Sequence, residues 1–381
     1  MREIFYSFLI TCFIFTIFSC GKTSEQNTND ALGTGGGSGT GCDNTKAFIV
    51  GNLVPEKGCH PNCEKNKAVI WNLCKSQKLL GDSSGVVDAT EHDGSIYIAD
   101  DGGFYWIVGN SISKQPLKHS GKKLLEVTGI DVNSNGDVYV AGLVRDHGME
   151  YGAYWKNGEL AKTFRENADW YSEKNVAADS NGNVFLPGFR MKSHSVIYSA
   201  YWKNGSLKKL TTTYDGEATD VAISGGKVYF SGAHGPICDI PCPATSGILA
   251  TYWKEGKMTK VTKVDTAGSK KKWIMRSRAS SIHVEGSTVY MAGDVDGEVP
   301  VYWKNKKQHE LPVEYNIDTC DYCLVEPIDI SILDDKVFVA GNYNNKEDGG
   351  YNGAVYWLDK KLHKLCEDCD SSDAVAVVVM D

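Results

Sequence analysis

The chain has 381 residues, of which 41% are hydrophobic and 10% aromatic, so it has ample apolar material for a packed core. This length fits one large domain or two ordinary ones. The formal net charge of −8 at pH 7 argues against a general electrostatic attraction to nucleic acid, and we expect no nucleic-acid partner.

An apolar stretch from Ile4 to Phe18 follows Arg2. It is short for a bilayer span but has the length of the apolar region of a secretory signal peptide. It ends in Ile17-Phe18-Ser19-Cys20, which resembles the lipidation signal of bacterial lipoproteins. The resemblance implies a signal peptide over residues 1–19 and a diacylglyceryl group on the sulfur of Cys20. The alternative is an ordinary secretory signal with an incidental cysteine.

The segment from Gly21 to Gly41 is rich in Gly, Ser, Thr and Asn, a composition that cannot pack a core. We therefore expect residues 20–45 to form a flexible tether with a root-mean-square reach of roughly 25 Å. With the lipidation signal, this predicts a monomeric domain at a bacterial cell envelope, held at the membrane only by its lipid. The side of the outer membrane stays open.

Two short phrases alternate along the rest of the chain, seven times each. Copies of the first phrase, of the type AYWKNGELAKTF, begin at Val69, Phe104, Ala153, Ala200, Thr251, Val301 and Val355. Copies of the second, of the type VYVAG, end at Gly51, Asp100, Gly142, Gly188, Gly232, Gly293 and Gly341. A period near fifty residues made of short alternating strands is typical of propeller blades. The pattern predicts one all-β domain over residues 46–381, a seven-bladed β-propeller with four-stranded antiparallel blades.

The stretch GIDVNSNGDVYVAG from Gly129 resembles NHL-type and bacterial seven-bladed propeller repeats, and the YWKNG continuation resembles repeats of bacterial lipoproteins of no assigned function. The resemblance implies a strand order from the ring centre outward, illustrated by 220–223, 227–232, 250–254 and 258–262. The same stretch matches the start of an EF-hand loop between Asp131 and Asp137. Because Gly142 stands where that loop needs a glutamate, we interpret it as a hairpin turn.

The two ends of the domain complement each other in this frame. Residues 373–381 read as a first strand with nothing after it, and Lys46–Gly51 as a second strand with nothing before it. One C-terminal and three N-terminal strands would complete the seventh blade and remove its exposed edges. The repeated Tyr-Trp pairs would pack between blades, so we assign to the core Trp71, Trp106, Trp155, Trp202, Trp253, Trp303 and Trp357.

Ten cysteines follow Cys20, and an even number outside the cytoplasm favours disulfides. Four local pairs, all expected on one face of the ring, are Cys59 with Cys63, Cys238 with Cys242, Cys320 with Cys323, and Cys366 with Cys369. Cys42 and Cys74 would form a fifth bridge on the other face. The alternative for the two C-x-x-C pairs is a zinc site with four thiolates, from Cys320, Cys323, Cys366 and Cys369.

Two tryptophans lie outside the repeats, Trp170 and Trp273, in long connections on the cysteine-rich face. Trp273 stands in a basic run with Lys271, Arg276 and Arg278, none of which falls in an expected strand. Exposed aromatic residues beside cations suit sugars, anionic polymers or an acidic protein. These five residues form the predicted binding site, although each tryptophan could instead cover the small core of its own loop.

The sequence contains no catalytic or phosphate-binding motif, and we predict no cofactor or metal. The leading hypothesis is a binding or scaffolding propeller for an unidentified protein or glycan, which could be anionic. The alternative is a hydrolase or lyase at the channel mouth, using calcium held by the recurring residues Asp88, Asp220, Asp329 and Asp373. Such recurrence also fits structural caps for backbone amides.

Overall fold

The structure, a computed structural model, describes residues 46–53, 67–73, 77–82, 85–100, 102–108, 111–164, 175–193, 196–211, 215–235, 247–261, 276–297, 299–313, 324–345, 351–365 and 371–380. The chain divides into two units, Met1–Asp30 and Ala31–Asp381, and every described residue belongs to the second. Among the described residues, no helix has the length and hydropathy needed to cross a membrane.

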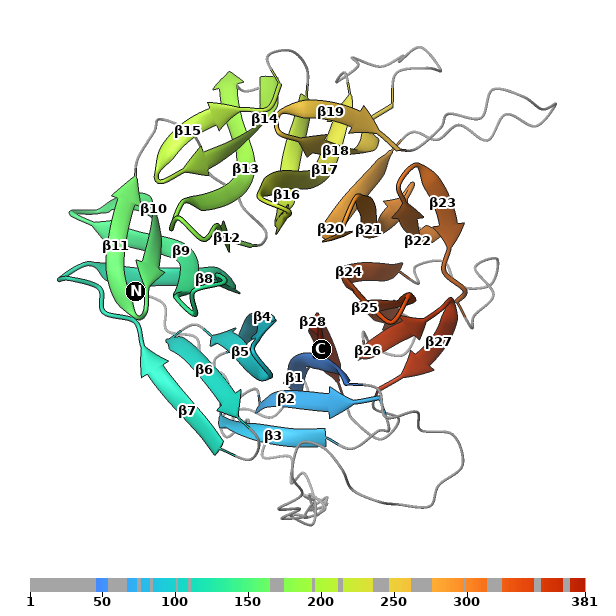
Figure 1. Cartoon of the computed structure of the whole chain (residues 1–381), viewed down its shortest axis with the longest axis horizontal. Coiled ribbons are helices and arrows are strands. Elements are labelled where there is room, and N and C mark those ends of the chain that lie inside the picture. The colour runs from blue at the N-terminus through green and yellow to red at the C-terminus, as the bar shows by residue number, and fades with distance from the viewer. Residues whose placement is uncertain are drawn as a thin grey trace, which may run out of the picture. The chain divides into compact units, whose positions relative to one another are not determined.

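Seven four-stranded antiparallel sheets stand as blades around a ring (Figure 1). Blade 1 comprises β4 (Val86–His92), β5 (Ser95–Asp100), β6 (Gly103–Val108) and β7 (Ser111–Pro116). Blade 2 comprises β8 (Lys123–Val132), β9 (Val138–Asp146), β10 (Met149–Lys156) and β11 (Glu159–Phe164). Blade 3 comprises β12 (Ala177–Ala178), β13 (Val184–Ser193), β14 (Val196–Lys203) and β15 (Ser206–Lys209).

The second half of the ring repeats this plan. Blade 4 comprises β16 (Asp215–Ser224), β17 (Lys227–Gly235), β18 (Leu249–Lys254) and β19 (Lys257–Lys260). Blade 5 comprises β20 (Ser277–Glu285), β21 (Thr288–Val295), β22 (Val299–Lys304) and β23 (Lys307–Glu310). Blade 6 comprises β24 (Leu324–Leu333), β25 (Lys336–Asn345), β26 (Tyr351–Leu358) and β27 (Lys361–Lys364). Blade 7 comprises β28 (Ser372–Val379), β1 (Ala47–Leu53), β2 (Lys67–Asn72) and β3 (Gln77–Asp82).

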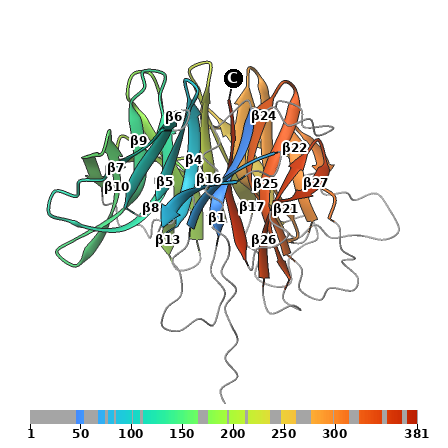
Figure 2. The same ribbon diagram turned by 90° about the horizontal axis from the view of Figure 1, so that it is seen from below.

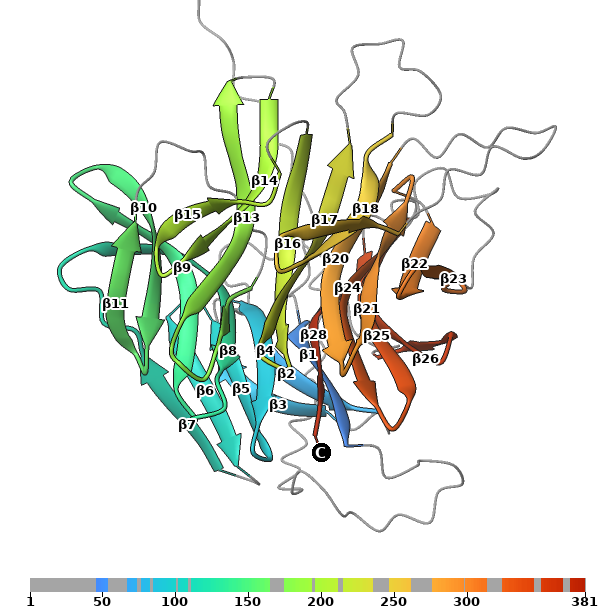
Figure 3. The same ribbon diagram turned by 45° about the horizontal axis from the view of Figure 1, so that its top comes forward.

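The ring closes through its two ends, as predicted. The last strand, β28, pairs antiparallel with the first, β1, for example Val377 opposite Ile49 (Figure 3). The innermost strands contact one another in the order β28, β4, β8, β12, β16, β20, β24 and back to β28. The seventh blade is therefore built from both ends of the domain, and no inner strand lacks a neighbour on either side.

The hydrophobic core lies between the blades. Seven clusters of buried side chains occur, one for each pair of neighbouring blades. Six repeat tryptophans are at most 1% exposed: Trp71, Trp155, Trp202, Trp253, Trp303 and Trp357. Trp303 packs toward blade 4 while its neighbour Tyr302 packs toward blade 6, because successive strand residues point to opposite faces. The core role is confirmed for these six; the side chain of Trp106 lies outside the description.

The glycine that ends the second phrase permits a close approach between strands in five of the seven blades. A Cβ on Gly293 would stand 1.9 Å from the carbonyl oxygen of Arg278, and one on Gly142 would stand 2.3 Å from that of Glu126. In both blades the first strand bulges next to this contact. The glycine therefore makes room for the bulge in the innermost strand.

Deleting residues 374–381 should abolish cooperative folding of the whole propeller. The deletion removes most of β28 and leaves the edge of β1 unpaired. It also removes Ala374 and Val377 from one inter-blade cluster and Ala376 and Val378 from the next. Calorimetry should show no native melting transition, whereas a chain lacking residue 381 alone should melt normally. A native transition in the longer deletion would contradict closure through the ends.

Candidate functional site

The propeller has two faces of different construction (Figure 2). On one, here called the turn face, tight turns join first to second strands and third to fourth strands. On the other, here called the long-connection face, second strands lead into third strands and each blade leads into the next. Connections on the long-connection face range from 147–148 between β9 and β10 to 261–276 between β19 and β20.

The YWKNG phrase builds the turn face. Asn157 and Gly158 have φ values of 52° and 82°, as a tight two-residue hairpin turn requires. The Asn157 side-chain oxygen accepts the N–H of Val138 at 2.8 Å, while the backbone N–H of Asn157 donates to the carbonyl oxygen of Val138. Asn204 makes the same double contact with Val184. The repeated asparagine thus fastens the outer hairpin to the second strand.

Three of the five predicted binding residues, Trp170, Lys271 and Trp273, lie outside the described residues. The structure places the other two, Arg276 and Arg278, at the start of β20 on the long-connection face. The expectation that Arg278 lies outside any strand is wrong. It belongs to β20, pairs in register with Asp294, and its Nε lies 2.6 Å from Oε1 of Glu217 on β16.

Carboxylates lie near both of these arginines. The backbone of Arg276 makes two hydrogen bonds with Asp296. The Arg276 carbonyl accepts the Asp296 N–H at 2.7 Å, and the Arg276 N–H donates to the Asp296 carboxylate. Burial raises the pKa of Asp294, although Arg276 and Arg278 act in the opposite direction. The Arg278 side chain is therefore paired with a carboxylate, and both arginines lie near Asp294.

One first-strand position, missed in the sequence, carries ionisable residues in five blades. It pairs with the residue after the second-phrase glycine, and its occupants are Glu126, Glu217, Arg278, Glu326 and Asp373. In four of these blades the residue stands 15 or 16 positions before that glycine, which is the signal that the sequence offers. All five stand at the long-connection end of the innermost strands, and four of them are acidic.

The recurring aspartates join neighbouring blades. Asp88 Oδ2 accepts the N–H of Ile130 in blade 2 at 2.9 Å, and Oδ1 accepts the N–H of Ala89 at 2.8 Å. Asp329 likewise accepts the N–H of Ile330 in its own blade and that of Val377 in blade 7, each at 2.9 Å. Each carboxylate thus replaces a missing strand partner between two blades.

Asp220 accepts three donors. Oδ1 accepts Val221 N–H at 2.6 Å and the Asn175 side-chain amide at 2.5 Å, and Oδ2 accepts Ile282 N–H in blade 5 at 2.8 Å. Ser281, the equivalent residue of blade 5, donates to Asp329 at 2.7 Å. These contacts link blades 3 to 6 in sequence around the ring.

Asp131 extends the same linkage, and Asp373 does not belong to it. Asp131, which is not one of the four recurring aspartates, accepts the N–H of Ala178 in blade 3 at 2.7 Å. Asp373 pairs with Asn52, and the position equivalent to Asp88 is occupied by Ala376 instead. Three of the four predicted aspartates therefore have an inter-blade structural role.

Two asparagines complete the circuit at blade 7. The Asn52 side chain accepts the N–H of Val86 at 2.8 Å and donates to its carbonyl at 3.2 Å, joining blade 7 to blade 1. Asn342 does the same with Ala374, joining blade 6 to blade 7. Every pair of neighbouring blades is thus bridged by at least one side chain.

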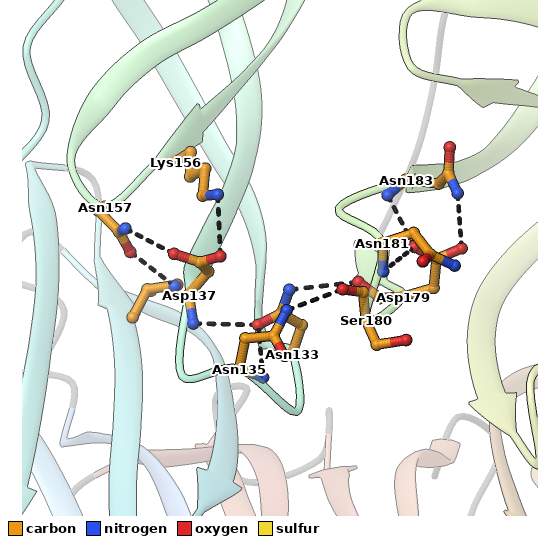
Figure 4. Close-up of polar contacts among 10 residues, drawn as sticks. Asn133, Asn135, Asp137, Lys156, Asn157, Asp179, Ser180, Asn181 and Asn183 are labelled. Atoms are coloured by element: carbon orange, nitrogen blue, oxygen red, sulfur yellow. Dashed lines mark hydrogen bonds and ion pairs between the residues drawn. The ribbon is translucent and has the colours of Figure 1, made fainter.

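The EF-hand-like stretch is a hairpin turn, as interpreted (Figure 4). The Asn133 oxygen accepts the N–H groups of Asn135 and Asp137, each at 3.0 Å. Asp137 contacts Lys156 and Asn157, and the lysine holds the pKa of Asp137 below its usual value. The Asn133 and Asn135 amides donate to carbonyls of the matching turn in blade 3. Within the described part of the chain, no cluster of three His, Cys, Asp or Glu side chains could hold a metal ion.

The cysteines assigned to lipidation and to disulfides all lie outside the described residues. Besides Cys20, they are Cys42, Cys59, Cys63, Cys74, Cys238, Cys242, Cys320, Cys323, Cys366 and Cys369. Three sets of assignments therefore stay predictions: the four local disulfides, the bridge between Cys42 and Cys74, and the alternative zinc site at the two C-x-x-C pairs.

No protein-family model and no curated protein matches the sequence. Among solved structures, the β-propeller domain of the Trilobed protease from Pyrococcus furiosus, described as having an open velcro topology, aligns with a TM-score of 0.52 at 10% identity, over 85% of this chain and 93% of that one. An acylaminoacyl peptidase from Pyrococcus horikoshii aligns with a TM-score of 0.49 at 12% identity over 84% of this chain. The chain spans 50% of the length of that peptidase. The polysaccharide lyase Uly1 aligns with a TM-score of 0.45 at 11% identity, over 84% of this chain and 88% of the lyase. At these identities the likeness concerns the propeller fold alone.

Replacing Asp220 with asparagine should destabilise the propeller by about 1–3 kcal/mol, because an amide presents only one acceptor to three donors. Asp373→Asn is the matched control, since its pKa is raised by burial in the same way but it is not part of the inter-blade linkage. Denaturant unfolding of both variants near neutral pH measures the difference. Equal effects would contradict the inter-blade role of Asp220.

The difference in stability between the native chain and Asp220→Asn should depend on pH. Burial raises the pKa of Asp220 from 3.8 to about 6 despite the donated hydrogen bonds. The folded state then binds a proton more tightly than the unfolded state. The stability of the native chain relative to Asp220→Asn should be greatest below pH 3.8 and fall by up to about 3 kcal/mol as pH rises through about 6. A difference that grows with pH would contradict this sign.

Proposed function

We propose that this chain is a non-enzymatic binding or scaffolding propeller, lipid-anchored at a bacterial cell envelope, that recognises a protein or glycan through its long-connection face. The observation that carries the proposal is the unequal construction of the two faces. The turn face is made of hairpins whose side chains are engaged in holding strands together, as at Asn157 and Asn204. The long-connection face joins the same framework to segments of widely different length.

The inner-strand carboxylates favour binding over catalysis. A hydrolase or lyase at the channel mouth would need carboxylate oxygens available to metal or substrate. In Asp88, Asp220 and Asp329, both oxygens accept hydrogen bonds that join blades or cap the strand. Metal binding at these groups would compete with the hydrogen bonds that join the blades.

The position of Lys46 agrees with a tether on the side away from the ligand. Lys46 precedes the second strand of blade 7, and second strands start at the turn face. Its carbonyl oxygen accepts the N–H of Met380 at 2.7 Å, so both ends of the described chain meet there. A lipid tether leaving from this point would leave the long-connection face open to a partner.

The experiment that tests recognition compares the two faces in living cells. A photo-crosslinking amino acid at Arg276 or Glu326 samples the long-connection face, and one at Asp93 or Asn135 samples the turn face; all four positions are exposed. We expect discrete adducts from the first pair alone.

A second arm of this experiment tests the predicted binding residues. Adding Lys271→Ala and Trp273→Ala to the Glu326 probe protein should remove the adduct, while Arg278 is kept because of its contact with Glu217. Adducts from the turn face alone, or unchanged by these substitutions, would overturn the assignment.

Replacing Cys20 with serine should move the protein from the membrane fraction to the soluble fraction, because the lipid is its only proposed anchor. Fractionation followed by a high-salt wash measures this. A Cys20→Ser protein that still sediments with membranes after the wash would contradict lipid anchoring through this residue.

A further inference from the structure

The outermost hairpins of four consecutive blades carry a concentration of positive charge. Segments 203–209, 254–260, 304–310 and 358–364, here called the cationic arc, contain three lysines each. Their only carboxylates are Glu255, Glu310 and Asp359, in a chain whose formal net charge is −8. The corresponding strands, β15, β19, β23 and β27, follow one another along the outside of the ring (Figure 1). The arc is therefore a local feature that overall composition does not explain.

Most of these lysines face solvent, and three at equivalent positions have no carboxylate partner in the described structure. All twelve except Lys203 and Lys254 are exposed. Lys257, Lys307 and Lys361 make no ion pair with any other described residue. Around blade 2, by contrast, ion pairs join Lys118 to Glu159 and Lys156 to Asp137. The positive charge of the arc is thus less neutralised than that of the lysines around blade 2.

The charges of neighbouring blades act on each other. His309 on β23 stacks on Tyr302, with ring centroids 4.6 Å apart. Its pKa is lowered first by burial and then by Lys360 of blade 6 and Lys307 of its own blade. The lysines of blades 5 and 6 therefore share one region of positive potential.

Protection of the sheet edges does not account for the sign of the charge. Lysines on an outer strand discourage edge-to-edge pairing, and other charged side chains can also do so. The first residue of the outer strand is Lys257, Lys307 and Lys361 in blades 4 to 6, and Glu159 in blade 2. The fold accepts either sign at this position.

We propose that the cationic arc binds a linear acidic polysaccharide along the outer edge of blades 3 to 6. The arc lies along the outside of the ring, where a flexible polymer can follow all four blades. It contains no arginine, the residue best suited to phosphate and nucleic-acid recognition. Lysine point charges suit spaced carboxylates or sulfates. This surface is separate from the long-connection face and does not depend on the function proposed there.

The test reverses charge where the fold accepts both signs. The arc variant carries Lys257→Glu, Lys307→Glu and Lys361→Glu. The control variant carries Lys46→Glu, Lys123→Glu and Lys227→Glu, exposed lysines outside the arc with the same total charge change. Both should melt close to the native chain, since Glu159 occupies the equivalent position in blade 2 and the control sites are exposed.

Binding of the full-length proteins to polygalacturonate is measured by calorimetry at ionic strengths of about 0.02 M and about 0.15 M. We expect the native chain to bind more weakly at the higher salt, the arc variant to lose at least about tenfold in affinity, and the control to stay within about twofold. Equal losses in both variants, or no loss in the arc variant, would overturn the proposal. Arc-dependent binding to anionic vesicles or duplex DNA without binding to polygalacturonate would overturn the polysaccharide assignment.

Discussion

The structure depends on contacts that the innermost strands make across the boundaries between blades. An innermost strand has a ladder partner on one side only, so its other backbone groups need acceptors or donors from elsewhere. Asp88, Asp131, Asp220 and Asp329 accept such amides from the next blade. Asn52 and Asn342 form double contacts at the two boundaries of blade 7. These side chains make a closed ring from separate sheets, and the inter-blade clusters then bury the tryptophans around them.

This constraint separates structure from recognition. Because the inner carboxylates and the turn-face asparagines are engaged in joining strands, they are poorly suited to vary with a ligand. Two other surfaces carry the proposals: the long-connection face, and the exposed lysine side chains on the outer hairpins of blades 3 to 6. The first surface supports the proposed protein or glycan recognition and the second the proposed polysaccharide contact. A rigid ring that presents two separate surfaces fits a scaffolding role.

The blade count, the strand order and the closure could be predicted because they follow from local signals that recur. The second-phrase glycine makes room for the bulge, and the Asn-Gly pair requires positive φ, so each marks one place in the blades that carry it. The contacts of the candidate site could not be predicted as well, because they join residues far apart in sequence. Arg278 and Glu217 form an ion pair, although the rest of blade 4 separates them in the sequence. Asp131 was not predicted because it lies after the position equivalent to Asp88. Asp373 was wrongly grouped with the other aspartates, because Ala376 occupies the equivalent position in β28.

Native-state hydrogen exchange of the amides that donate across blade boundaries tests the closed ring most directly. The amides of Ile130, Ala178, Ile282 and Val377 lie in blades 2, 3, 5 and 7. If the ring is one cooperative unit, all four should exchange only through global opening, with the free energy of unfolding measured by denaturant. Val377, in the strand that closes the ring, should be as well protected as Ile130. Exchange of Val377 at a much lower free energy than the other three would show that blade 7 opens alone, and would contradict the account.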